Sequence, residues 1–307
     1  MAGLKRGAAI LASSLLVATT SYAAAPDCPN DGVVRFAIIP GEDTSQLLPI
    51  YTRIGQLISD QLKCDVKIQF GTNYTAAIEA MRAHRAEVGV FGAFSYILAH
   101  QVAGAEVVAT FAGKDGKPGP YYATITTWPG SGINTLADVK GKAFAFSDPA
   151  STSGHLIPSY GLTKAGIDPA KDIRPLYTGS HTASFEALRN HKVPVGELNG
   201  TAISAAKAAG SYKESDFVML WKSEPIPNSP FAVRGDLDAG FKARLTQVLQ
   251  TLDLSTMPEK DMKFIEGGGP RSRAHRRSRL RPDPRRGDRA SSRPEQDEGM
   301  NLQHLSG

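Results

Sequence analysis

Hydrophobic residues along the chain alternate between two spacings, which predicts strands followed by helices. The apolar runs Val33–Ile39 and Val66–Phe70 are typical of strands. Between them, over Leu47–Leu62, apolar residues recur at three- and four-residue steps and predict one face of a helix. The hydroxyl residues at 44–45 are suited to cap its start. The first unit is therefore a strand, a helix and a second strand.

The same alternation continues to about residue 222. The later predicted segments are helices over Thr75–His84, from Ser95, and over His155–Lys164, Ala183–Asn190 and Ala202–Ala209, with strands over Val88–Phe91, Glu106–Phe111, Ala143–Phe146, Arg174–Tyr177 and Phe217–Lys222. Strands that alternate with helices are typical of an α/β protein with parallel sheets. There are too many units for one small sheet, so we expect more than one lobe.

Two loops rich in proline suggest where the chain passes between lobes. KDGKPGP covers 114–120 and EPIPNSP covers 224–230. If the chain crosses at both, residues 33–120 and 231–266 form the first lobe, and residues 121–230 form the second. Ligand sites commonly lie in the cleft between such lobes.

The start of the chain is typical of a secretory signal peptide. Lys5 and Arg6 precede an apolar run over Ala8–Ala18, and small residues follow. We expect a signal peptide over residues 1–24, cleaved near 23–25, and therefore an exported protein. A short membrane anchor is the alternative, although the apolar run is short for a bilayer of about 30 Å.

The chain has two cysteines, Cys28 and Cys64. In an exported protein an even number of cysteines suggests a disulfide, which here would tie the mature N-terminus to the end of the first helix. Two unrelated thiols are the alternative. Neither the cysteines nor the histidines have the spacing of metal ligands, so we expect no metal.

Charge separates the body of the chain from its end. In the 307 residues, hydrophobic residues are 41% and charged residues 21%, a globular composition. Residues 1–269 hold 25 basic and 25 acidic residues, whereas residues 270–307 hold ten arginines, no lysine and five acids, so the net charge of +5 lies in this tail. The body is not a basic nucleic-acid-binding surface.

The Arg-rich tail, residues 267–307, has no hydrophobic period and little to bury, so we expect it to be disordered. One interpretation is an arm that binds nucleic acid or another anionic surface. The interpretation that we favour is a reading-frame change in GC-rich DNA, which tends to produce arginine, proline, serine and glycine without lysine.

The segment Phe146–Gly154 is the strongest candidate for chemistry. A strand ends, a proline turn follows, and Ser151, Thr152 and Ser153 open a helix. The first turn of a helix presents unpaired N–H groups and a partial positive charge, and serine and threonine hydroxyls add donors. This arrangement is suited to hold an oxyanion. An ordinary helix cap is the alternative.

Other predicted strand-to-helix turns carry further candidates. His181 opens a helix after a strand and could donate a hydrogen bond to an anion, or it could be a surface histidine. Tyr74 follows a turn in the first lobe and could offer a hydroxyl, an aromatic wall or a hydrophobic staple. The remaining candidates are Phe94, Ser95, and one of Tyr121 and Tyr122 at the first crossing.

Motifs of common enzyme classes are missing from the sequence. It contains no GxSxG, GxxxxGK[ST], HExxH or GxGxxG. Ser153 with His181 is the only nucleophile and base that we can pair. We therefore expect a binding protein rather than a transferase or hydrolase.

Four stretches together resemble a known family: Tyr74–Ala99, Phe146–Pro158, Gly179–Leu188 and Ser223–Val233. The sequence resembles the substrate-binding proteins of phosphonate-type ABC transporters, over roughly Val33–Glu266. The resemblance implies a type II periplasmic-binding-protein fold, with two α/β lobes and a hinged cleft.

The resemblance also implies roles for the candidates. Ser151, Thr152 and Ser153 match hydroxyls that hold a phosphorus oxyanion, His181 matches a histidine that donates to it, and Tyr74 and one of Tyr121 and Tyr122 match tyrosines of the cleft.

Two departures from the family change the expectation. Where binders of aminoalkylphosphonates have an acid for the ammonium, this chain has Asn228. A buried ammonium without a carboxylate is costly, so we expect a ligand without an amine. Pro194 stands where the family has aspartate, which could weaken a strand or be an error in the sequence.

The sequence thus predicts a monomeric periplasmic binding protein that holds a small phosphorus oxyanion (phosphite, methylphosphonate, another small phosphonate or phosphate) for an ABC permease of the inner membrane. The alternative is another small anion, such as a sulfonate or carboxylate. We expect no cofactor and no nucleic-acid partner.

Overall fold

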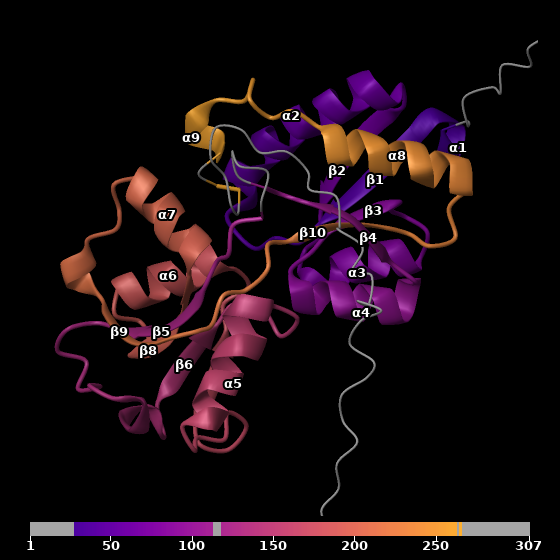
Figure 1. Ribbon diagram of the computed structural model, residues 1–307. Coiled ribbons are helices and arrows are strands. Elements are labelled where there is room, and N and C mark those ends of the chain that lie inside the picture. The colour runs from indigo at the N-terminus through magenta and orange to yellow at the C-terminus, as the bar shows by residue number, and fades with distance from the viewer. Residues whose placement is uncertain (1–27, 113–117, 263, 266–307) are drawn as a thin grey trace, which may run out of the picture. The chain divides into compact units, whose positions relative to one another are not determined.

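The computed structural model describes residues 28–112, 118–262 and 264–265 (Figure 1). The predicted signal peptide, part of the first crossing loop and the Arg-rich tail lie outside the described residues.

Two separate five-stranded sheets organise the described part of the chain, in the orders β2-β1-β3-β10-β4 and β7-β6-β8-β5-β9. The strands of the first sheet are β1 (Val33–Ile38), β2 (Asp65–Phe70), β3 (Val88–Val90), β4 (Glu106–Thr110) and β10 (Pro230–Val233). Those of the second are β5 (Ala123–Thr127), β6 (Ala143–Phe146), β7 (Arg174–Tyr177), β8 (Val195–Asn199) and β9 (Val218–Lys222). The predicted pair of α/β lobes is confirmed.

Helices cover both faces of each sheet. The helices of the first lobe are α1 (Pro29–Gly32), α2 (Thr44–Leu62), α3 (Tyr74–Arg82), α4 (Ala93–Ala103), α8 (Ala239–Thr251) and α9 (Glu259–Met262). Those of the second are the short turns η1 (Leu136–Val139), η2 (Thr152–Leu156) and η3 (Glu214–Asp216), with α5 (Ile157–Lys164), α6 (His181–Arg189) and α7 (Gly200–Ala208). In Figure 1, α2 and α8 lie on one face of the first sheet and α3 and α4 on the other.

Each sheet is mixed, which corrects the expectation of parallel sheets. β10 runs antiparallel to β3 and β4, and β5 runs antiparallel to β8 and β9. The reason is the double crossing. β5 and β10 are each entered directly from the other sheet, so they start at the edge where the neighbouring strands end.

Two details differ from the expectations from the sequence: the residue that caps α2 and one strand of the second sheet. Asp43, not Thr44 or Ser45, caps α2, because its carboxylate accepts from the Ser45 amide at 2.9 Å. β8 is absent from the strands that the periodicity predicted, although the family resemblance implied a strand at Pro194. It starts directly after this proline, at a position where the ladder needs no N–H.

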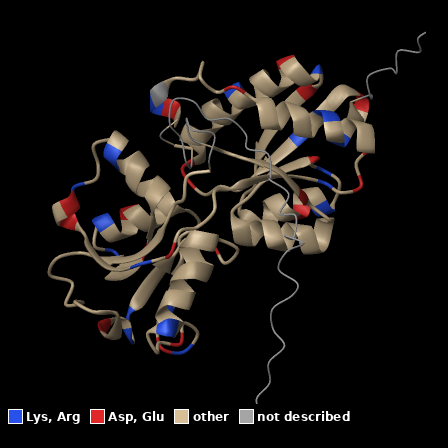
Figure 2. Ribbon diagram, viewed as in Figure 1, with Lys and Arg blue, Asp and Glu red and all other residues tan. Residues whose placement is uncertain are grey.

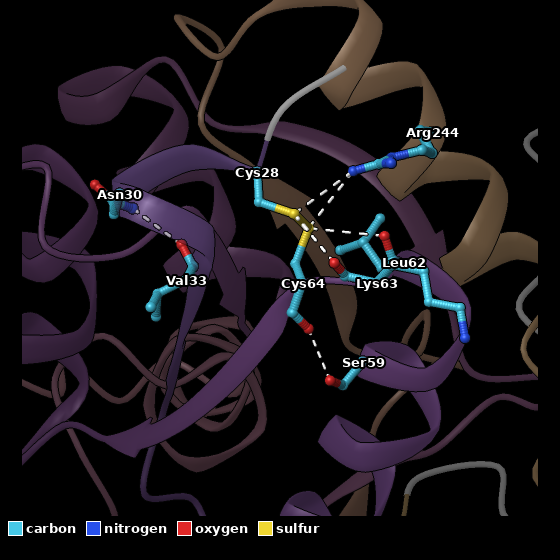
Figure 3. Close-up of a disulfide and its surroundings, with 8 residues drawn as sticks. All are labelled: Cys28, Asn30, Val33, Ser59, Leu62, Lys63, Cys64 and Arg244. Carbon is cyan, nitrogen blue, oxygen red and sulfur yellow. Dashed lines mark hydrogen bonds between the residues drawn. A yellow bond between two sulfur atoms is a disulfide. The ribbon is translucent and has the colours of Figure 1, made fainter. Parts of the chain in front are cut away.

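The predicted disulfide is present. Cys28 and Cys64 are bonded, with Cα atoms 5.8 Å apart, and join the start of the described chain to the end of α2 (Figure 3). The Arg244 guanidinium of α8 lies against both sulfur atoms, at 3.7 and 3.5 Å. The bond therefore also fixes the packing of α2 and α8 at this end of the first lobe.

Acidic and basic residues of both lobes are interspersed along the helices and loops in the view of Figure 2. Within the described ranges, no helix is both long and apolar enough to cross a bilayer.

Candidate ligand-binding site

The candidate side chains stand where strands end and helices begin. Asn73, Ser180 and Asn199 cap α3, α6 and α7, each accepting from the amide three residues on. Ser151 does the same at the π-helical turn η2, where its hydroxyl accepts from the Gly154 amide at 3.0 Å. Ser151 is therefore a helix cap, as the alternative interpretation expected, and its hydroxyl also contacts the ring of His181.

His181 joins two of the predicted hydroxyls. Its Nε2 lies 3.5 Å from the Ser151 Oγ and 3.4 Å from the Ser153 Oγ, and all three residues are buried. The Asn199 amide donates to the Ser153 hydroxyl at 3.3 Å. These polar atoms converge at the start of η2, as the sequence suggested for an oxyanion cradle.

The opposite nitrogen of His181 faces a carboxylate that sequence reasoning missed. Nδ1 lies 2.9 and 3.0 Å from the two oxygens of Glu197, which is fully buried in β8. A carboxylate can only accept, so Nδ1 carries a proton. Glu197 belongs to a strand that was not predicted, and nothing local in the sequence pairs it with a residue 16 positions earlier.

Tyr74 comes from the first lobe and is 2% exposed. Burial raises the pKa of its phenol well above the ordinary value, a hydrogen bond with Ser151 opposes that rise, and the nearby carboxylates of Glu42, Asp148 and Glu197 add to it. Tyr74 therefore stays protonated and keeps an O–H donor beside Ser151.

A cavity of about 70 Å³ lies against these residues. Its wall is formed by Ile38, Ile39, Gly41, Glu42, Leu47, Tyr51, Tyr74, Val90, Phe111, His181, Asn199, Thr201, Ser229, Phe264 and Ile265. Both lobes contribute, and none of the described residues in this wall is a lysine or arginine. Ser151 and Ser153 are not part of the wall but touch His181, which is.

Two further acids lie at the cavity or beside one of its wall residues. Glu42 is in the cavity wall and accepts from the Thr182 hydroxyl at 2.8 Å. Asp148 accepts from the amides of Tyr74 at 3.3 Å and Ala150 at 2.8 Å. The signal for Glu42 was its position directly after Pro40-Gly41 at the end of a strand, the same kind of turn that drew attention to the other candidates.

Hydrogen bonds link the two lobes around the site. The Phe94 amide donates to the Thr152 hydroxyl at 2.8 Å, and the His181 amide donates to the Gly41 carbonyl at 2.8 Å. Thr152 thus contacts the first lobe, and Phe94 takes part through its backbone.

Other predicted residues lie outside the cavity wall. The Ser95 hydroxyl is fully buried and donates to the Gly92 carbonyl of its own turn at 3.1 Å. Tyr121 pairs with Ile226 and packs in the small cluster there. The Tyr122 ring lies under the Lys222 ammonium at 3.9 Å. These side chains are not brought to His181.

Asn228 is also outside the wall, although its neighbour Ser229 is part of it. The Asn228 amide donates to the Phe111 carbonyl at 3.2 Å, at the end of the first crossing from β4. The residue is 4% exposed.

Residues 36–270 match the model of a family described as ABC transporter, phosphonate, periplasmic substrate-binding protein. The chain belongs to this family. Family members are periplasmic binding components of transporters, so this chain is a binding protein and not an enzyme.

Individual relatives agree with the family. The chain is 28% identical over 246 residues to the phosphate-import protein PhnD of Mycolicibacterium smegmatis. The aligned region covers 76% of each chain. It resembles the solved binding component of a Pseudomonas aeruginosa ABC phosphonate transporter, with a TM-score of 0.68 and 26% identity over 79% of this chain and 81% of that one.

A third likeness concerns the fold. The PhnD1 structure of Prochlorococcus marinus, in complex with methylphosphonate, matches with a TM-score of 0.69 and 22% identity, over 80% of this chain and 93% of that one. The binding protein therefore has the type II periplasmic-binding-protein fold that its sequence implied.

Proposed function

We propose that this binding protein holds a small phosphorus oxyanion at the start of η2. The observation that carries the proposal is the convergence of the Ser151 and Ser153 hydroxyls on the His181 Nε2, all within 3.5 Å and buried. Three donors close together suit a group with several oxygens on one atom. The relatives support this choice, since their names refer to phosphonate and phosphate.

Binding uses both lobes. Tyr74 of the first lobe, protonated and bonded to Ser151, adds a donor from the other side. The crossings near residues 120 and 230 act as the hinge, and Phe94 with Thr152 joins the lobes beside the ligand. The monomeric protein, exported to the periplasm, then presents the ligand to an ABC permease.

Two side chains bear on whether the site accepts a ligand with an amine. Asn228 donates its side-chain amide to the Phe111 carbonyl and lies outside the cavity wall, which supports a ligand without an amine. Glu42, however, puts a carboxylate in the cavity wall. The ligand without an amine remains our choice, and an aminated phosphonate is the comparison that decides it.

The experiment is a thermal-shift panel on the full chain. The ligands are phosphite, methylphosphonate, 2-aminoethylphosphonate, phosphate, sulfate, an alkanesulfonate and acetate. At about 100 times its dissociation constant, a ligand stabilises the folded state by about 2.7 kcal/mol, which raises the melting temperature measurably. We expect this rise with phosphite or methylphosphonate.

The remaining outcomes are equally specific. A rise only with the aminated phosphonate would assign Glu42 to an ammonium. A rise only with sulfate, the sulfonate or acetate, or none at all from folded protein, would overturn the phosphorus oxyanion. The double variant Ser151→Ala with Ser153→Ala, with its fold checked by circular dichroism, should lose the shift.

A further inference from the structure

The buried pair of His181 and Glu197 contains a carboxylate that the oxyanion cradle alone does not require. Ser180, not His181, caps α6. The His181 amide is held by the Gly41 carbonyl, so the backbone fixes the residue without its ring. Glu197 nevertheless places both oxygens within 3.0 Å of one ring nitrogen, at 0% exposure, in the middle of the second sheet. Burying a carboxylate for its packing alone is expensive.

We propose that Glu197 is a positioning residue that holds His181 as the doubly protonated imidazolium, with its Nε2–H directed at the ligand oxygen. The proposal rests on the proposed function, because it assigns a role at the same site. The oxyanion then meets a positive charge and a fixed donor, although the cavity wall has no lysine or arginine among the described residues.

The alternative protonation state would oppose binding. In a neutral His181 the proton stays on Nδ1, because Glu197 can only accept there. Nε2 then presents a lone pair beside Ser151 and Ser153, and both hydroxyls would turn toward it. An anion would meet a ring nitrogen that repels it and hydroxyls that are already used.

The charged groups around the ring favour the imidazolium. Glu197 faces it from β8, and Glu42, from the turn after β1, lies in the same cavity wall as the ring. Asp148, from the turn after β6, accepts from the amide of the neighbouring Tyr74. Tyr74, from α3, is neutral because its pKa is raised. Gly41 brings these elements together, since a Cβ there would lie 3.1 Å from the Tyr74 hydroxyl and 3.9 Å from the His181 ring. The Glu197 carboxylate against Nδ1, with Glu42 in the same cavity wall, therefore stabilises a positive charge on the ring.

The chain contains a matched control. Glu87 of the first lobe is also 0% exposed and bonded to cations, but its partners are Arg35 and Arg234, and it is not in the cavity wall. Glu87→Gln and Glu197→Gln therefore make the same chemical change to a buried, paired carboxylate in the two lobes. Glu197→Asp keeps the charge and shortens the side chain.

Two readouts test the proposal on the full chain. The first is the ¹⁵N shift of the His181 ring against pH without ligand, assigned with His181→Asn. We expect an imidazolium at pH 7 in the wild type and in Glu87→Gln. In Glu197→Gln we expect the ring to lose its proton about one pH unit lower or more, with partial recovery in Glu197→Asp.

The second readout is the dissociation constant of methylphosphonate between pH 5.5 and 8.5. The ionisation of the ligand is common to all variants and cancels in their ratio. The ratio of Glu197→Gln to wild type should rise about tenfold or more across this range, while that of Glu87→Gln stays constant.

Opposite results are easily recognised. A neutral His181 ring at pH 7 in the wild type overturns the proposal, even if no Glu197 variant folds. So does a ratio for Glu197→Gln that is flat with pH, which would leave Glu197 a structural partner. If the ring titrates as expected but the wild type binds no phosphorus oxyanion at any pH, the proposed function fails and the role of Glu197 toward the ring stands.

Discussion

In the described part of each lobe one glutamate is completely buried, and the two are used differently. Glu87, before β3, takes hydrogen bonds from the Arg35 side chain at 2.6 and 3.1 Å and from the Arg35 amide at 2.8 Å, with Arg234 at 3.5 Å. Glu197, in β8, has the His181 ring. The first carboxylate is paired with arginines, which stay charged, and the second with an imidazole.

The contrast separates stability from recognition. Burial alone would raise the pKa of Glu87, but the hydrogen bonds from the Arg35 side chain and amide outweigh it and leave the pKa lowered. An ion pair with arginine stays formed at any physiological pH. The disulfide between Cys28 and Cys64 is in the same lobe. The first lobe is thus stabilised independently of ligand. The second lobe contains the hydroxyls and the histidine that we assign to ligand binding.

Removing the disulfide tests this division with the largest expected effect. In Cys28→Ser with Cys64→Ser, the loop of 36 residues opens, and the free energy of unfolding should fall by about 4 kcal/mol on the chain-entropy estimate. The dissociation constant of methylphosphonate should not change. Urea unfolding followed by far-UV circular dichroism measures the first and calorimetry the second.

The reduced wild type is the control for the disulfide, because it should lose the same stability without a substitution. Trp128 and Trp221, the two tryptophans, both lie in the second lobe. Their fluorescence shows whether that lobe unfolds with the first. An affinity that falls as much as the stability would contradict the division between the lobes.

Glu87→Gln should cost about 3 kcal/mol at pH 7, since it leaves two arginines beside a buried amide. Because the pKa of Glu87 is lowered in the folded state, its contribution is present above the ordinary value near 4.5 and is lost as the pH falls through the lower, folded value. The urea midpoints of variant and wild type should therefore converge in acid, and midpoints that stay parallel would count against the ion pair.

How much of this could be predicted from the sequence depends on whether the signal is local. A strand that ends in a polar turn before a helix is written in consecutive residues, so Ser151–Ser153, His181 and Tyr74 were all found in this way. Asn199 obeys the same rule and was missed only because β8 was not recognised, a short strand next to Pro194.

The pairing between segments could not be predicted. Nothing near Glu197 in the chain indicates that His181 lies against it, because β8 and α6 are brought together by sheet order. For the same reason the hydrogen bond from the Asn228 side chain to the Phe111 carbonyl was not foreseen. The antiparallel strands β5 and β10 likewise follow from the double crossing and not from any residue within them.

Gly154→Ala should impair recognition in the second lobe. A Cβ at this position would collide with the Ser147 hydroxyl and lie 2.8 Å from the His181 ring. Both neighbours are buried, so relief requires a shift that costs about 2 kcal/mol, and moving the ring away from Ser153 should raise the dissociation constant more than tenfold. Gly200→Ala, whose Cβ would meet nothing closer than 4.0 Å, is the matched control. Equal affinities for the two variants would show that the ring is not held where binding needs it.

Thr152→Val should have the smallest effect and is the sharpest test of the link between the lobes. It keeps the shape of the side chain but removes the oxygen that accepts from the Phe94 amide, at a cost of about 1 kcal/mol. Because this bond joins the lobes, the cost should appear as a dissociation constant that is about fivefold higher. Thr163→Val removes a hydroxyl that donates to the Ser159 carbonyl within α5, and it should leave binding unchanged. If instead both variants lose stability equally and neither loses affinity, the Phe94 contact belongs to packing, and recognition is confined to the hydroxyls and the histidine of the second lobe.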